Sequence, residues 1–188
     1  MTRYFAVLTV LLLMGLVLTR VFTMKRRGVD AMHFRQIDKT DYFIPPFALF
    51  YLYVIFAAAL GWPLPSTREL FDSEVVRWIG VTLCLAGLAL LAWSLASFGQ
   101  SFRVGIDAER PDKRVTTGIF AFSRNPIYVG FALILLGQFL ISSSWLLLAF
   151  LVAGYWLLHR QVLREEEFLR RQYGRDFEEY CQRVRRYV

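Results

Sequence analysis

Residues Tyr4–Thr23 read YFAVLTVLLLMGLVLTRVFT, an apolar run whose single charge, Arg20, lies close to its end. A helix rises about 1.5 Å per residue, so it needs about 20 apolar residues to cross the roughly 30 Å core of a bilayer. The basic sequence MKRR at Met24–Arg27 follows, where a cleaved signal peptide has small residues. The stretch therefore predicts a helix that stays in the membrane and spans it.

Four more apolar blocks follow, at Phe43–Trp62, Val75–Phe98, Pro126–Ile141 and Trp145–His159. The last two are short, about 22–24 Å as helices, and only three serines separate them. They predict either two thin spans or a hairpin that stops short of the far side. The predicted fold class is all-α: a polytopic membrane protein of about five transmembrane helices, the last two forming a hairpin, plus a cytoplasmic C-terminal helix.

The composition of the whole chain agrees with this fold. Of its 188 residues, 56% are hydrophobic and 20% are charged, against about 45–50% and about 25% in soluble domains. These values exclude a disordered chain, a secreted disulfide scaffold and an ordinary water-soluble enzyme. We predict a single membrane domain over residues 1–188, with three spans in 1–98 and the loop, hairpin and tail in 99–188.

Basic residues predict the orientation of the chain. Of the 22 lysines and arginines, all but Arg3, Arg68 and Arg77 fall on one side of the predicted spans. Positive residues concentrate in cytoplasmic loops, so we expect the N-terminus outside and both the 99–125 loop and the C-terminus in the cytoplasm. The net charge of +7 therefore comes from basic residues gathered on the cytoplasmic side of the membrane. Because this distribution explains the charge, no nucleic-acid partner is expected.

Several common chemistries have no signature in this chain. No Ser-His-Asp set, phosphate-binding P-loop or dinucleotide-binding glycine motif is evident. The two histidines and two cysteines lack the spacing of metal ligands, so no metal site is predicted. The predicted spans hold almost no ionisable residues, which disfavours a proton-coupled transporter.

One polar constellation remains, on the predicted cytoplasmic side. Pro126 can begin a helix, whose N-terminal N–H groups favour an anion, and Arg124 adds a positive charge. The hairpin returns Glu165 and Glu166 to the same side. An anion-binding and a cation-binding group held in this way match the carboxylate and ammonium of an amino acid.

The same residues can also have a purely structural role, and the sequence leaves both interpretations open. Arg124 can be a charge that flanks a span on its cytoplasmic side. Glu165–Glu167 can form a solvated helix face, with arginines at 160, 164, 170 and 171 as partners at helical spacing.

The residues and spacing of this segment resemble those of the isoprenylcysteine carboxyl methyltransferase and phospholipid methyltransferase superfamily of membrane enzymes. The family pattern is Gly-x-Tyr-x-x-x-Arg-His-Pro-x-Tyr-x-Gly, an apolar hairpin, Glu-Glu, and an aromatic tail around Tyr-Gly. The matching residues are Gly118, Arg124, Pro126, Tyr128, Gly130, Glu165, Glu166, Tyr173, Gly174, Phe177 and Tyr180. Asn125 departs from the pattern, which has His there.

The resemblance implies an S-adenosylmethionine site in the C-terminal half. It places Arg114 and Val115 near the adenine, and Glu165 and Glu166 at the ammonium and sulfonium. It also implies that residues of the loop and of the following helix start bind the cofactor, with those from Arg124 to Tyr128 at its carboxylate. The cofactor-binding residues of this segment are Gly118, Arg124, Asn125, Pro126, Tyr128 and Gly130.

For catalysis we expect Asn125 and Glu166 at the reacting groups, and Arg103 on a carboxylate or phosphate of the acceptor. Arg103 can equally be a flanking charge. Asn125 cannot carry a proton charge as His can, which favours an acceptor that is already anionic. The acceptor should be lipophilic, because the site opens beside membrane lipids: an isoprenylcysteine-like carboxylate, a phospholipid or a small lipophilic nucleophile.

Two other functions remain as alternatives. An NADPH-dependent membrane sterol reductase has a related C-terminal half, and Tyr173-Gly174 with Tyr180-Cys181 fits its ending. However, 188 residues leave little room for a sterol cavity. A non-enzymatic membrane subunit that keeps the scaffold is the other alternative.

Overall fold

The computed structural model describes residues 2–26, 44–62, 69–98 and 116–188. Within these ranges the elements are helices, with two isolated β-bridges and no strand. They are α1 (Thr2–Arg26), α2 (Ile44–Leu60), α3 (Glu74–Phe98), the 3-10 helix η2 (Gly118–Ala121), α4 (Pro126–Ile141), α5 (Trp145–Tyr173) and α6 (Arg175–Arg183). The predicted all-α class is confirmed.

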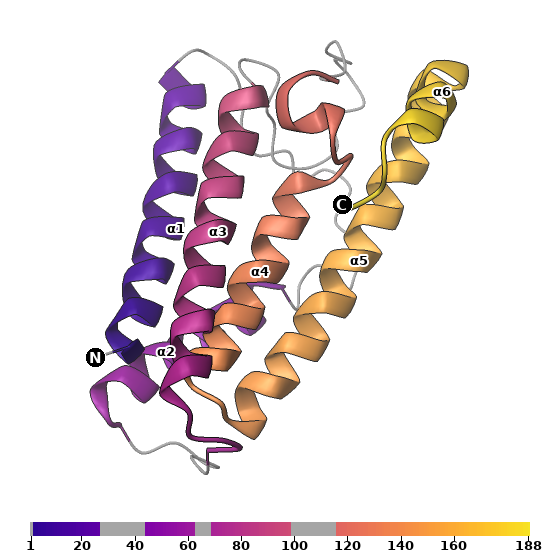
Figure 1. Cartoon of the computed structure of the whole chain (residues 1–188). Coiled ribbons are helices and arrows are strands. Elements are labelled where there is room, and N and C mark those ends of the chain that lie inside the picture. The colour runs from indigo at the N-terminus through magenta and orange to yellow at the C-terminus, as the bar shows by residue number, and fades with distance from the viewer. Residues whose placement is uncertain (1, 27–43, 63–68, 99–115) are drawn as a thin grey trace.

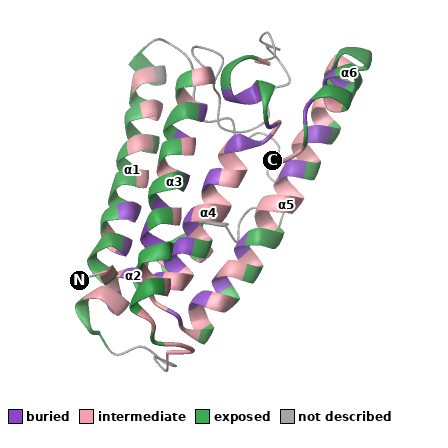
Figure 2. Cartoon of the chain, in the orientation of Figure 1, coloured by how far each residue is buried: buried purple, intermediate pink, exposed green. Residues whose placement is uncertain are grey.

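The long helices lie side by side, with α1, α3, α4 and α5 in sequence across the view of Figure 1. Three helices are long and apolar enough to cross a membrane, over Thr2–Thr23, Glu74–Ser97 and Trp145–Tyr173. Two shorter apolar helices, Pro45–Leu60 and Pro126–Ile141, complete the five that the sequence predicts. Many large apolar residues are exposed, and exposed positions run along the helices in Figure 2, which suits a surface in contact with lipid. The chain is an all-α membrane protein.

The end of α5 differs from the prediction. The expected span stops at His159, but α5 continues as one helix of 29 residues to Tyr173. Ser144 caps its N-terminus by accepting a hydrogen bond from the Leu147 N–H at 3.3 Å. Residues 160–172 are mostly Arg, Glu, Leu and Gln, which favour helix. The apolar block therefore ends where the polar residues begin, but the helix continues through them. The extension carries Glu165 and Glu166 on a rigid element.

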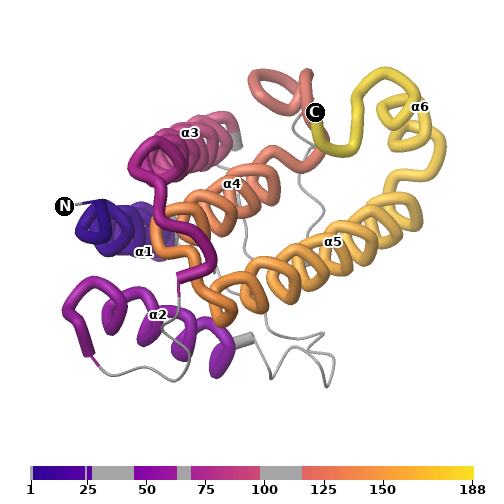
Figure 3. Tube along the Cα trace, turned by 60° about the horizontal axis from the view of Figure 1, so that its bottom comes forward, coloured from indigo at the N-terminus to yellow at the C-terminus, as the bar shows by residue number. Residues whose placement is uncertain are grey.

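Helix α2 occupies a separate place in the bundle. Figure 3 shows it beside the ends of α1 and α5 that lie opposite the C-terminal helix. Phe47, Phe50 and Tyr51 of α2 pack their rings around Phe150 of α5, with the closest ring centroids 4.8 Å apart. The helix spans 17 residues, shorter than the predicted 43–62 block, and it packs against the first half of α5, away from the polar constellation.

Glycines set the spacing of α3 and α4. A Cβ added to Gly137 would lie 2.5 Å from the Gly80 carbonyl oxygen and 2.7 Å from Cys84 Sγ. One added to Gly130 would lie 2.8 Å from Leu91 Cγ. Small residues let membrane helices approach closely where water supplies no driving force. Gly130, expected to bind cofactor, therefore has a packing role between α3 and α4 and sits outside the polar cluster.

We expect Gly137→Ala to destabilise the protein by about 1–3 kcal/mol, the usual cost of overpacking, because neither the Gly80 backbone nor Cys84 can yield without separating the helices. The measurement is thermal unfolding in detergent micelles. Gly15→Ala in α1 is the matched control, since nothing lies within 4 Å of its added Cβ. Equal melting temperatures for the two variants would contradict the close contact of α3 and α4.

Candidate functional site

The segment before α4 is held by a turn and by α6. Gly118 has a positive φ of 65°, and a Cβ there would lie 2.7 Å from Ser97 Oγ. Glycine is therefore required both by the backbone and by the end of α3. Tyr180 of α6 donates a hydrogen bond to the Phe120 carbonyl oxygen at 2.6 Å. These contacts explain Gly118 and Tyr180 as residues that place the loop entering α4.

Asn125 and Pro126 begin α4, with Asn125 at the N-cap and the buried Pro126 inside the first turn, where its missing N–H costs nothing. The Asn125 side chain makes no capping bond. Its amide instead donates to Glu166 Oε1 at 3.3 Å and to the Arg186 carbonyl oxygen at 3.1 Å. The residue that replaces the family His thus connects α4, α5 and the C-terminal segment.

Glu166 lies at the centre of the cluster, where its side chain is only 5% exposed. Arg186 donates through Nε to both carboxylate oxygens, at 3.2 and 3.1 Å, and its terminal nitrogen lies 2.9 Å from Oε2. An Arg124 nitrogen lies 3.4 Å from Oε1. The hydrogen bond to Glu166 raises the pKa of Arg186 above its ordinary value. A buried carboxylate is therefore matched by two fixed positive charges.

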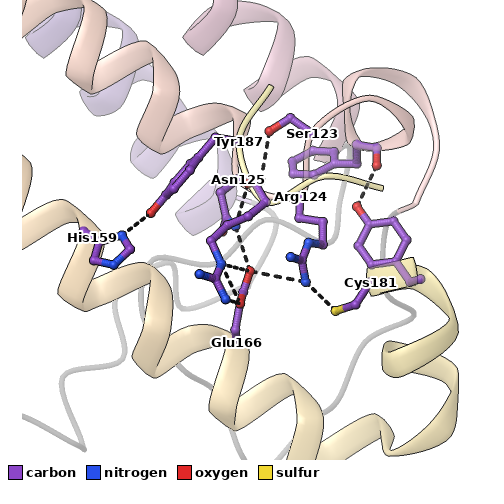
Figure 4. Close-up of polar contacts among 10 residues, drawn as sticks. Ser123, Arg124, Asn125, His159, Glu166, Cys181 and Tyr187 are labelled. Carbon is purple, nitrogen blue, oxygen red and sulfur yellow. Dashed lines mark hydrogen bonds and ion pairs between the residues drawn. The ribbon is translucent and has the colours of Figure 1, made fainter. Parts of the chain in front are cut away.

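Arg124 makes its contacts with Cys181 and Glu166 through one terminal nitrogen, Nη1. Its side chain is 12% exposed, and it donates to Cys181 Sγ as well as approaching Glu166. Its Nε–H is buried and has no hydrogen-bond partner among the described residues. Buried polar groups are normally paired, so this guanidinium presents an unused donor suited to an anion. Figure 4 shows Arg124, Asn125 and Glu166 pointing toward one another.

Glu165 has its own set of partners. Tyr128, near the start of α4, donates its hydroxyl hydrogen bond to Glu165. Gln161 Nε2 donates to Glu165 Oε1 at 3.1 Å. The adjacent carboxylates therefore lie in separate networks, and Tyr128 with Glu165 forms a second link between α4 and α5.

The structure brings together many of the predicted site residues. Arg124, Asn125 and Glu166 form one cluster, Tyr128 and Glu165 an adjacent pair, and Pro126 starts the helix between them. The predicted residues Arg103, Arg114 and Val115 lie outside the described residues. Sequence reasoning missed Arg186, which no motif spacing indicates, and the contact between His159 Nδ1 and the Tyr187 hydroxyl at 2.6 Å.

These helices and this cluster define a helical membrane protein with a buried, charged site at one end of a hairpin. The model of the phospholipid methyltransferase family matches residues 75–176, more than half of the chain. The chain belongs to the phospholipid methyltransferase family.

Three similar proteins carry related names. A probable protein-S-isoprenylcysteine O-methyltransferase from Oryza sativa subsp. indica is 29% identical over 119 residues, 62% of each chain. Protein-S-isoprenylcysteine O-methyltransferase B from Arabidopsis thaliana is 31% identical over 113 residues, 57% of each chain. The Schizosaccharomyces pombe protein-S-isoprenylcysteine O-methyltransferase is 32% identical over 105 residues, 54% of this chain and 44% of its own. The chain thus matches less than two thirds of these relatives' lengths.

Proposed function

We propose that the protein is an integral membrane methyltransferase that moves a methyl group from S-adenosylmethionine to a lipophilic acceptor. The observation that carries this proposal is the convergence of Arg124 and Asn125, at the entrance to α4, with Glu166 of α5. All three lie within the residues that match the methyltransferase family. A charged cluster of this kind beside apolar helices suits a polar cofactor and an acceptor that arrives from the bilayer.

The residues fit an amino acid headgroup. The Nε–H of Arg124, which no described residue accepts, suits the cofactor carboxylate, because a guanidinium binds carboxylates through parallel hydrogen bonds. Glu166, and Glu165 beside it, suit the ammonium. When bound, S-adenosylmethionine supplies a methyl group already activated on a sulfonium, so these side chains are needed to bind, orient and exclude water.

The acceptor that fits best is an isoprenylcysteine-like carboxylate. The groups that touch Glu166 are an amide and two guanidiniums, which do not exchange protons near neutral pH. A carboxylate needs no base to become a nucleophile, whereas an ammonium must first lose a proton. Oxygen acceptors also agree with the names of the relatives, which are O-methyltransferases.

For orientation, we propose that the N-terminus lies outside and that the cluster faces the cytoplasm. The proposal is supported by the basic residues of α5, α6 and the C-terminus, which follow the last apolar block. In spheroplasts, a membrane-impermeant thiol reagent should label Thr2→Cys and spare Val188→Cys, both made in a background without Cys84 and Cys181. The reverse pattern would overturn this orientation.

The test of the acceptor is methyl transfer with isotopically labelled S-adenosylmethionine to an S-prenylated cysteine, its carboxamide and an aminophospholipid. The prediction is labelling of the free carboxylate only. Labelling of the phospholipid alone would overturn the proposed acceptor while keeping the methyltransferase, and labelling of none would count against the transfer activity itself.

A further inference from the structure

The last residues of the chain return to the charged cluster. After α6, Arg185 forms a parallel β-bridge with Ser123, and the Arg124 N–H donates to the Arg185 carbonyl oxygen at 2.9 Å. The Asn125 side chain donates to the Arg186 carbonyl oxygen at 3.1 Å. We call residues 184–188 the C-terminal strap. It lies against the loop that enters α4 and is fixed to that loop through its backbone.

The side chain of Arg186 covers Glu166 from the solvent. The Arg186 side chain is 39% exposed, while the Glu166 side chain beneath it is 5% exposed. Arg186 contacts both carboxylate oxygens. With Asn125 and Arg124 on Oε1 as well, Glu166 has no open oxygen toward solvent. An ammonium can reach this carboxylate only when Arg186 gives way.

A second anchor lets Arg186 move without loss of the strap. The Tyr187 hydroxyl lies 2.6 Å from His159 Nδ1, and the His159 ring stacks parallel to that of Tyr155. Burial raises the pKa of Tyr187 above its ordinary value, so the hydroxyl stays protonated and can donate to Nδ1. The strap is therefore held on both sides of Arg186, by its backbone and by Tyr187, and a rotation of the Arg186 side chain suffices.

We propose that Arg186 is a cofactor-binding residue that exchanges partners: it leaves Glu166 to the cofactor ammonium and binds the cofactor carboxylate itself. This inference rests on the proposed function and names a residue outside the segment that matches the family. One ion pair opens and two form, Glu166 with the ammonium and Arg186 with the carboxylate. Arg124, whose Nε–H lies in the same cluster and has no partner in the described part of the chain, is the second guanidinium for that carboxylate. The strap thereby closes over the amino acid end of the cofactor.

The experiment compares two ligands by isothermal titration calorimetry on the full chain in lipid nanodiscs. S-adenosylmethionine carries both charges, whereas its decarboxylated analogue keeps the ammonium and sulfonium and lacks the carboxylate. For the wild type we expect clear preference for S-adenosylmethionine. Arg186→Gln should reduce the ratio of the two affinities at least tenfold, and Arg186→Lys should retain part of it. Arg185→Gln is the matched control, because Arg185 is exposed and joins the loop through its backbone.

The ratio of the two affinities distinguishes binding of the cofactor carboxylate by Arg186 from a purely structural role of this residue. If Arg186→Gln weakens both ligands equally, Arg186 only supports the fold and the inference is wrong. If it strengthens both equally, Arg186 merely competes for Glu166, and its contact with the carboxylate is refuted. Wild-type protein that binds neither ligand would overturn the proposed function, and this inference with it. Wild-type binding with an unchanged ratio in Arg186→Gln would overturn the inference alone.

Discussion

Glu166→Gln is expected to weaken S-adenosylmethionine binding by about 10- to 150-fold, because a hydrogen bond to a charged group contributes about 1.5–3 kcal/mol. The variant should also lower stability, since it leaves two guanidiniums without their shared carboxylate. Breaking a buried ion pair costs about 3–5 kcal/mol, and we expect the lower end of that range because Arg186 is 39% exposed. Calorimetry and thermal unfolding measure the two effects.

Glu167→Gln is the matched control for this change. It is the next residue on α5, its side chain is 61% exposed, and its ion pair is with Arg171, four residues on. Exposed pairs of this kind contribute little, so both binding and stability should stay close to the wild type. The double variant Glu166→Gln with Arg186→Gln should recover part of the stability without recovering binding. Wild-type affinity in Glu166→Gln would refute the role of this carboxylate.

Arg124→Lys is expected to reduce the affinity for S-adenosylmethionine at least tenfold while changing the melting temperature little. Lysine keeps the positive charge near Glu166, so the buried carboxylate stays neutralised. It loses the Nε–H that has no partner among the described residues and the planar fork that binds a carboxylate through two hydrogen bonds. Calorimetry measures the affinity, and the unfolding profile reports whether the cluster is intact.

Arg171→Lys provides the comparison for Arg124→Lys. The Arg171 side chain is 77% exposed, so the same substitution there should leave both affinity and melting temperature unchanged. A large fall in stability for Arg124→Lys with unchanged binding per folded molecule would mean that Arg124 serves the fold alone.

Part of the site could be predicted because its residues lie in segments with strong local signals. Pro126 marks a helix start, and the apolar blocks on either side of the serine turn predict a hairpin that returns to its origin. Those two features place Asn125 and Glu166 at the same end, and the structure joins them by a hydrogen bond of 3.3 Å.

Other features could not be predicted from the apolar blocks and the motifs. The apolar block ends at His159, but the polar residues beyond it favour helix, and α5 continues to Tyr173. Gly130 stands in a motif with predicted binding residues, yet its environment is the face of α3. Arg186 is one of eight arginines after His159, and only the return of the chain after α6 selects it as the partner of Glu166.

The proposed role of the charged cluster is to bind the amino acid end of S-adenosylmethionine. Calorimetric titration of wild-type protein in nanodiscs with S-adenosylmethionine, and separately with NADPH, tests it most directly. We expect saturable binding of S-adenosylmethionine at one site per chain and no binding of NADPH. Saturable binding of NADPH without S-adenosylmethionine would refute this role and point to a reductase, and binding of neither would favour a non-enzymatic membrane subunit.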